Sequence, residues 1–259
     1  MTARHGGGTL PAAASHAASY RTFERLLPAP LRRYLLFFEA EIERAVAAFA
    51  DSLPAAARVI DAGAGECQYA GHFGQHRYIA VDLGIGDAAW DYRKLDAIAD
   101  LTALPFPSAS FDACLNVVTL EHVKEPARAI EEMARVLTPG GRLLLIVPHE
   151  WEVHQAPHDY FRYTRYGVAW LLERAGLSVL EIRPVGGWFR LMSRRLLNGL
   201  QFFRGPLIPI AAFFLAPPAL VLPWFDAIDR ERNFTLGYIC IAQKPGRRSG
   251  LPVAGRIIP

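Results

Sequence analysis

The chain has 259 residues, enough for one large domain with an elaboration, and 52% of them are hydrophobic, so a substantial core can form. Twenty-eight basic and 25 acidic side chains leave a formal charge of +3, too small to indicate a nucleic-acid partner. Three scattered cysteines argue against a disulfide framework and for a reducing compartment. The N-terminus lacks a basic region followed by an apolar core, so we expect no secretory signal and a cytoplasmic location.

Residues 1–29 are rich in Gly, Ala and Ser and predict a disordered leader. From Leu31 the apolar residues fall at helical spacing to about residue 50, with charged residues on the other face. We therefore predict that residues 30–56 form an N-terminal helix that packs on the core.

Strands and helices alternate after this helix. Short apolar segments predict strands at residues 58–61, 78–82, 96–100, 111–118, 142–147, 177–185 and 234–242. Pro126 suits the first turn of a helix that Pro139-Gly140-Gly141 stops, and Thr164 suits the N-cap of another that Gly176 follows. The pattern predicts an α/β fold: a doubly wound, Rossmann-like, mostly parallel seven-stranded sheet with an antiparallel last strand. Its core spans residues 57–186 and 234–244, and residues 245–259 form a flexible tail.

A hydrophobic insertion, residues 187–233, interrupts this order. Its segment 205–225 has no charged residue and is long enough to span a membrane, but it contains five prolines. A single crossing is excluded because the strands on either side join one sheet. We expect an interfacial hairpin that turns at Pro217-Pro218 and contacts the membrane surface; the alternatives are a lid over the substrate site, a structural cap or a dimer face. The nearby basic cluster suits anionic headgroups and comprises Arg190, Arg194, Arg195 and Arg204.

Residues 59–65 read as a buried strand that breaks into a tight glycine turn. Open α/β sheets bind ligands outside the carboxyl ends of their strands, and Asp82 ends the second strand, where a carboxylate can accept both hydroxyls of a ribose. Gln68 follows Gly63 and Gly65 where a dinucleotide fingerprint needs a third glycine, which disfavours a nicotinamide-dependent oxidoreductase. A ligand with a ribose and an amino-acid end, but no phosphate, fits better.

From about residue 58 to 187, and again from 234, the sequence resembles class I S-adenosylmethionine-dependent methyltransferases of the small-molecule type, in a bacterial branch associated with the cell envelope. Residues 135–141 are the most specific match. The resemblance implies S-adenosyl-L-methionine as cofactor, bound by Asp61, Gly63, Ala64, Gly65, Asp82, Leu83, Asp100, Leu101, Asn116, Val117 and His122. Cys67 stands where many members have a third glycine, and its side chain is expected to narrow the pocket.

Candidate catalytic residues follow the fifth strand: His149, His158, Asp159 and Tyr160. His158 with Asp159 would form a general base for a hydroxyl acceptor. The alternative is that this segment only orders its loop and caps the next helix through Thr164. The spacing of His149, His154 and His158 matches no standard metal site, so we predict none.

The resemblance, together with the apolar insertion, implies S-adenosylmethionine-dependent methyl transfer to a small-molecule or lipid/glycan-linked acceptor. We expect O-methylation by a cytoplasmic protein that is peripheral at the inner face of the membrane. A second hypothesis is a catalytically inactive methyltransferase-like fold that serves as a membrane-associated interaction module. It predicts a filled or unused cofactor pocket.

Overall fold

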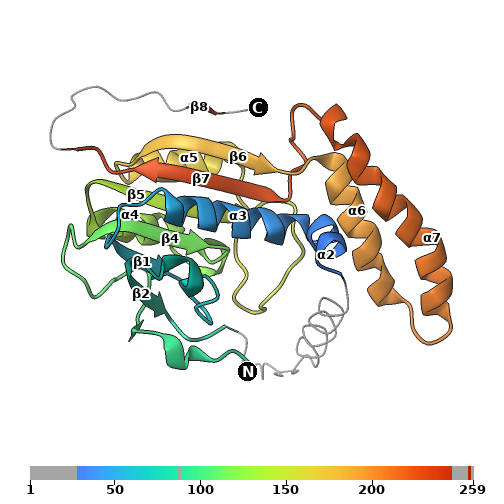
Figure 1. Cartoon of the computed structure of the whole chain (residues 1–259), viewed down its shortest axis with the longest axis horizontal. Helices are drawn as coiled ribbons and strands as arrows, with labels where there is room; N and C mark the ends of the chain where they lie inside the picture. The colour runs from blue at the N-terminus through green and yellow to red at the C-terminus, as the bar shows by residue number, and fades with distance from the viewer. Residues whose placement is uncertain (1–27, 87–88, 247–255, 258–259) are drawn as a thin grey trace, which may run out of the picture.

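A computed structural model describes residues 28–86, 89–246 and 256–257; most of the predicted leader and most of the predicted tail lie outside this part of the chain (Figure 1). The strands are β1 Arg58–Ala62, β2 Arg77–Asp82, β3 Ala97–Ile98, β4 Phe111–Val117, β5 Leu137–Pro148, β6 Ser178–Val185, β7 Gly237–Gln243 and β8 Arg256–Ile257. The helices are α2 Ala29–Leu35, α3 Phe37–Asp51, α4 Pro126–Val136, α5 Arg165–Arg174, α6 Trp188–Asn198 and α7 Leu207–Val221.

The strands form one sheet in the order β3-β2-β1-β4-β5-β7-β6-β8. Strands β1 to β5 are parallel to one another, whereas β7 runs antiparallel to both β5 and β6. The predicted doubly wound sheet with an antiparallel last strand is therefore confirmed, with β8 as a short additional strand parallel to β6.

Both faces of the sheet are buried. Along β5, Leu143 and Leu145 belong to one core cluster and Leu144 and Ile146 to the other, since successive side chains of a strand point to opposite faces. Helices α4 and α5 cover the first face, and α3 covers the second.

Strand β5 starts earlier than its apolar segment predicts. Helix α4 ends at Val136 and β5 begins at Leu137, so Pro139-Gly140-Gly141 lies inside the strand instead of ending the helix. Thr138 precedes a proline, which disfavours helical backbone at that residue and favours the extended chain found there. The register then shifts opposite Phe111, where β5 holds extra residues.

The predicted N-terminal helix is two helices, because Leu36 breaks the α-helical path with φ −94° and ψ 56°. Helix α3 buries Phe38, Ile42 and Val46 against the sheet. Helix α2 buries none of its side chains; instead, the Tyr34 hydroxyl donates to the Leu220 carbonyl of α7 at 2.5 Å. The break at Leu36 therefore lets α3 pack on the sheet while α2 contacts α7.

The insertion forms a hairpin of α6 and α7 that projects from one end of the sheet (Figure 1). Its turn lies between Phe203 and Pro206, so the predicted turn at Pro217-Pro218 is wrong: both prolines lie inside α7. Within the described part of the chain, Leu207–Ile228 is one helical segment whose length and composition would allow it to cross a membrane.

Candidate functional site

The glycine turn after β1 requires glycine at its first position. Gly63 has φ +99°, and a Cβ there would lie 2.3 Å from Cγ2 of Thr119, which follows β4. Gly65 has φ +52°, and a Cβ there would lie 3.2 Å from the Trp90 ring. Bare backbone therefore faces the space beside the turn, where a ligand can approach closely.

Asp82, at the end of β2, holds this turn in place. One carboxylate oxygen accepts from the Gly65 N–H at 3.0 Å and the other from the Gly84 N–H at 2.8 Å. The free lone pairs of the same oxygens remain available to ribose hydroxyls. Asp82 thus shapes the turn as well as offering the predicted cofactor contact.

The loop after β3 is anchored from helix α4. Arg135 donates to the carbonyls of Phe106 and Leu104 at 2.8 and 3.0 Å, and Glu132 accepts from the Leu104 N–H at 2.8 Å. This anchoring presents Asp100 and Leu101 to the cavity. Arg135 in the most specific sequence match therefore has a structural role.

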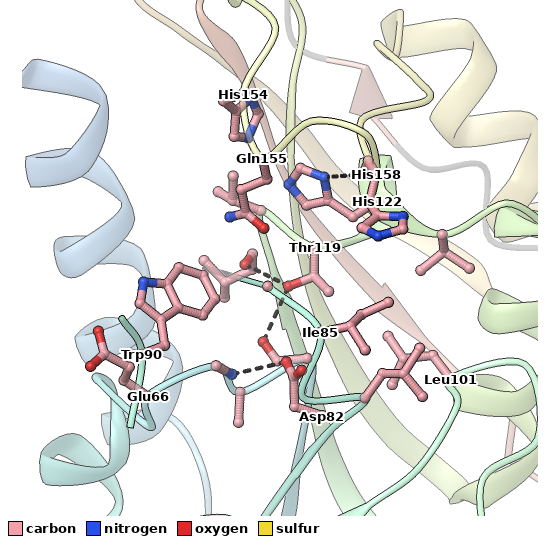
Figure 2. A pocket seen from close by; sticks show the side chains of 18 of the residues that line it. Glu66, Asp82, Ile85, Trp90, Leu101, Thr119, His122, His154, Gln155 and His158 are labelled. Carbon is pink, nitrogen blue, oxygen red and sulfur yellow. Dashed lines mark hydrogen bonds between the residues drawn. The ribbon is translucent and has the colours of Figure 1, made fainter. Parts of the chain in front are cut away.

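A cavity of about 700 Å³ opens at these strand ends (Figure 2). Asp82 and Leu101 lie at one end of it, and His122, His154 and His158 lie at the other. Most of the predicted cofactor residues line it, namely Gly63, Ala64, Gly65, Asp82, Leu83, Asp100, Leu101, Val117 and His122. The volume lies in the range of small-molecule and cofactor sites.

Asp61 and Asn116 do not line the cavity but lie behind it. The Asp61 side chain is buried and accepts from the Tyr78 hydroxyl at 2.5 Å. Asn116 Nδ2 donates to the Ala62 carbonyl at 2.6 Å and so joins the ends of β4 and β1. We assign both a positioning role, in contrast to the direct contact that the resemblance implies.

Burial raises the pKa of Asp61 to about 7, against the opposing effect of the Tyr78 hydrogen bond. A carboxyl group whose pKa is higher in the folded than in the unfolded chain stabilises the fold fully at about pH 4, and this contribution is lost as the pH rises through about 7. We therefore expect the wild type to lose up to about 4 kcal/mol of stability relative to Asp61→Asn between these pH values. Urea denaturation of both proteins across this range measures the difference; a constant difference would contradict the prediction.

Cys67 does not narrow the cavity as expected. Its side chain is buried with Ala64 and Ala80, and its thiol lies 3.6 Å from the Lys94 carbonyl. Its backbone has φ +58°, the left-handed region that favours glycine, which explains why glycine is suited to this position. The three cysteines are buried and form no disulfide.

The four catalytic candidates separate into two pairs. His158 and Tyr160 line the cavity, with 3.0 Å between His158 Nδ1 and the Tyr160 hydroxyl. His149 and Asp159 do not line it: His149 Nδ1 lies 2.9 Å from the Tyr163 carbonyl, and Asp159 accepts two hydrogen bonds from Arg162 at 2.6 and 2.7 Å.

The predicted contact of His158 with Asp159 is not formed, because Asp159 is committed elsewhere. Burial raises the pKa of Asp159, but hydrogen bonds from Arg162 and from the His154 N–H outweigh this effect and lower the pKa to about 2. Such a carboxylate is a poor general base at neutral pH.

Sequence reasoning missed several residues of the cavity wall. Helix α3 contributes Phe38, Glu39, Ile42 and Glu43, and the loops contribute Glu66, Trp90, Thr119, Trp151 and Gln155. The helical periodicity of α3 signalled one buried face but not that this face also borders the cavity. His154, one of the histidines that the sequence offered as a candidate base after the fifth strand, also lines the cavity.

Comparison with known proteins agrees with this geometry. Residues 60–145 match the family described as "Methyltransferase domain". The chain is 33% identical to a tRNA (carboxymethyluridine(34)-5-O)-methyltransferase of Arabidopsis thaliana over 115 residues, 42% of this chain and 28% of the relative. It is 42% identical to a demethylmenaquinone methyltransferase of Renibacterium salmoninarum over 71 residues, 26% of this chain and 30% of the relative.

A third relative is a malonyl-acyl-carrier-protein O-methyltransferase of Yersinia pestis, 34% identical over 98 residues, 33% of this chain and 34% of the relative. The matches thus span only 28% to 34% of the length of these three relatives.

Solved structures share the fold over more of the chain. One is the 1,6-didemethyltoxoflavin-N1-methyltransferase of Burkholderia thailandensis with bound S-adenosylhomocysteine, with a TM-score of 0.51, 19% identity and 93% of each chain covered. Another is a Haemonchus contortus phospholethanolamine N-methyltransferase 2 with the same ligand, with a TM-score of 0.50, 15% identity and 80% of this chain and 53% of the other covered. Residues 60–145 therefore carry a methyltransferase domain, and the sheet around them has the fold of class I S-adenosylmethionine-dependent methyltransferases.

Proposed function

We propose that the protein transfers a methyl group from S-adenosylmethionine to an oxygen of a small-molecule or lipid/glycan-linked acceptor at the membrane surface. The observation that carries this proposal is one cavity with the glycine turn and Asp82 at one end and the His158–Tyr160 pair at the other. Bound S-adenosylmethionine supplies an electrophilic methyl group, so the protein has to align the two reactants and exclude water.

The ends of the cavity have different tasks. Gly63, Gly65 and Asp82 bind and orient the cofactor, with Leu101 as the apolar contact for its base. His158 takes the proton of the acceptor hydroxyl, and Tyr160, 3.0 Å away, orients the imidazole. The names of two relatives, the tRNA and malonyl-acyl-carrier-protein enzymes, specify methylation at oxygen, which supports this chemistry.

The α6–α7 hairpin supports an acceptor at the membrane. The largest apolar side chains of α7 and the turn after it are exposed, among them Phe213 at 73%, Phe214 at 68% and Trp224 at 74%. A lipid surface would bury such side chains. The demethylmenaquinone enzyme among the relatives is named for an apolar substrate, in line with this proposal.

The basic cluster belongs to the hairpin itself, and its three arginines on α6 have acidic partners within the protein. Arg194 is buried, pairs with Glu39 at 2.9 Å and stacks on the Trp151 ring at 3.9 Å. Arg190 and Arg195 likewise have acidic partners, Asp226 at 3.5 Å and Glu152 at 2.5 Å. Of the four arginines, Arg204 at the hairpin turn is the exposed one.

Because Glu39 and Trp151 line the cavity, Arg194 connects the base of the hairpin to the cavity wall. A hairpin held at the membrane would therefore hold the mouth of the cavity near the same surface.

The function is tested by incubating purified protein and S-adenosylmethionine with a membrane extract and searching by mass spectrometry for products that gain one CH2 group. We expect such a product with the wild type and none with His158→Asn, which should still bind the cofactor by calorimetry. Cofactor binding without any product in the wild type would contradict the proposed reaction. No cofactor binding at all would favour the inactive interaction module.

We expect the double substitution Phe213→Glu/Phe214→Glu to lower binding to anionic phospholipid vesicles by about two orders of magnitude, because two buried phenylalanines contribute roughly 3 kcal/mol or more. Co-sedimentation measures the change. Tyr166→Glu, which alters an exposed aromatic residue of α5, is the matched control and should bind as the wild type does. Equal binding by all three proteins would contradict membrane contact through α7.

A further inference from the structure

Three hydrogen-bond acceptors converge at the histidine end of the cavity without a donor between them. Glu121 is fully buried, and neither carboxylate oxygen has a hydrogen-bond partner in the described part of the chain. The Nε2 atoms of His122 and His154 lie 3.6 and 3.7 Å from Glu121 Oε1. One donor atom from each residue falls within 4.8 Å of the other two.

The surroundings fix the tautomer of His122. Its Nδ1 lies 2.6 Å from the His158 carbonyl, which can only accept, so Nδ1 carries the proton. Nε2 of neutral His122 therefore presents a lone pair toward Glu121, and this buried nitrogen has no hydrogen-bond partner among the described residues.

His154 is oriented in the same way. Its Nδ1 lies 3.2 Å from the Glu152 carbonyl and 3.4 Å from Asp159 Oδ2, both acceptors. Arg162 is 3.5 Å from this nitrogen, but its guanidinium already donates to Asp159 at 2.6 and 2.7 Å. The proton of His154 is thus on Nδ1, and its Nε2 lone pair also points toward Glu121.

Two lone pairs and a buried carboxylate at these distances form a site that a cation would suit. A proton on either Nε2 would draw the nitrogen to within about 2.7–3.2 Å of the carboxylate, closer than the 3.6 and 3.7 Å found here. Two ligands of a tetrahedral ion with bonds of ~2.1 Å lie about 3.4 Å apart, which is closer to the two nitrogen–oxygen separations found here.

We propose that Glu121, His122 and His154 form a binding site for a divalent transition-metal ion of the zinc type. Two imidazoles and a carboxylate suit such ions. The His158 carbonyl and the Asp159 carboxylate accept from the other ring nitrogens and so orient the two rings, as carbonyls and carboxylates commonly do behind metal-bound histidines.

Three protein ligands leave a coordination position open. His122 and His154 line the same cavity as His158. If the proposed methyl transfer holds, an oxygen of the acceptor can bind there and become more acidic.

The test uses Zn²⁺ alone on chelator-treated full-length protein. We expect calorimetry to show one ion bound per chain, and Co²⁺ to give the visible absorption of a site with nitrogen and oxygen ligands. Glu121→Gln and His154→Gln should each weaken Zn²⁺ binding at least about tenfold. His72→Gln, which alters a histidine paired with Glu43 outside the cluster, should leave it unchanged.

Thermal unfolding keeps the test independent of activity and of folding defects. Zn²⁺ should raise the unfolding temperature of the wild type but not that of Glu121→Gln, a variant that removes a buried unpaired charge and should fold at least as well. Absence of Zn²⁺ and Co²⁺ binding, or binding that survives Glu121→Gln and His154→Gln together, would overturn the metal site without bearing on methyl transfer. In that case a second proton, on Nε2 of His154, would balance the Glu121 carboxylate instead of a metal ion.

Discussion

Asp82→Ala is expected to weaken S-adenosylmethionine binding by about two orders of magnitude. The substitution removes the proposed ribose contact, and a hydrogen bond to a charged group is worth about 1.5–3 kcal/mol. It also removes the acceptor for the Gly65 and Gly84 N–H groups, so the turn that approaches the cofactor loses its support. Calorimetric titration with S-adenosylmethionine measures the loss.

Asp91→Ala is the matched control for this experiment. Asp91 is another aspartate of the same region, but its carboxylate pairs with Arg93 at the surface. The control should bind the cofactor with wild-type affinity. Unchanged binding in Asp82→Ala would remove the ribose contact from the proposal, provided that circular dichroism shows the same fold for both variants.

The cofactor end of the site could be predicted because each of its features is local in sequence. A strand followed by two closely spaced glycines predicts a tight turn, and an acid at the end of the next strand predicts a ribose contact. The structure places Gly63, Gly65 and Asp82 around one cavity as expected. The strand order follows from the same alternation, since parallel strands connected by helices have few ways to form one sheet.

The histidine end could not be predicted because it depends on contacts between distant segments. Glu121 and His122 lie 32 or more residues before His154 in sequence, and no spacing rule relates the two segments. The spacing of His149, His154 and His158 matches no metal motif, and in the structure His149 lies against Tyr163 while Glu121 joins His154 instead. Tertiary packing alone decides this grouping.

Prolines do not end the second helix of the hairpin, although their usual effect on helices predicts that they would. Pro217 and Pro218 lie inside α7. A proline removes one helical hydrogen bond and crowds the preceding turn, a cost that packing against α6 can offset. The actual turn contains Arg204, Gly205 and Pro206, a charged residue followed by two residues that disfavour helix.

Gly63→Ala is expected to lower the free energy of unfolding by about 2–4 kcal/mol and to abolish detectable cofactor binding. The new methyl group would lie 2.3 Å from Thr119 Cγ2 and 2.6 Å from Thr119 Oγ1, so the ends of β1 and β4 would have to separate. The positive φ of Gly63 adds backbone strain for any other residue. Urea denaturation measures the stability, and calorimetry measures the binding.

Gly140→Ala separates the two causes. Gly140 has φ +84°, close to that of Gly63, but a Cβ there would meet no atom within 4 Å. Gly140→Ala therefore introduces the backbone strain without a steric clash. We expect it to lower the free energy of unfolding by about 1 kcal/mol and to leave cofactor binding unchanged. If Gly63→Ala were no more destabilising than Gly140→Ala, the contact with Thr119 would not constrain the turn. If Gly63→Ala also bound the cofactor as the wild type does, close backbone approach at Gly63 would not be required for binding.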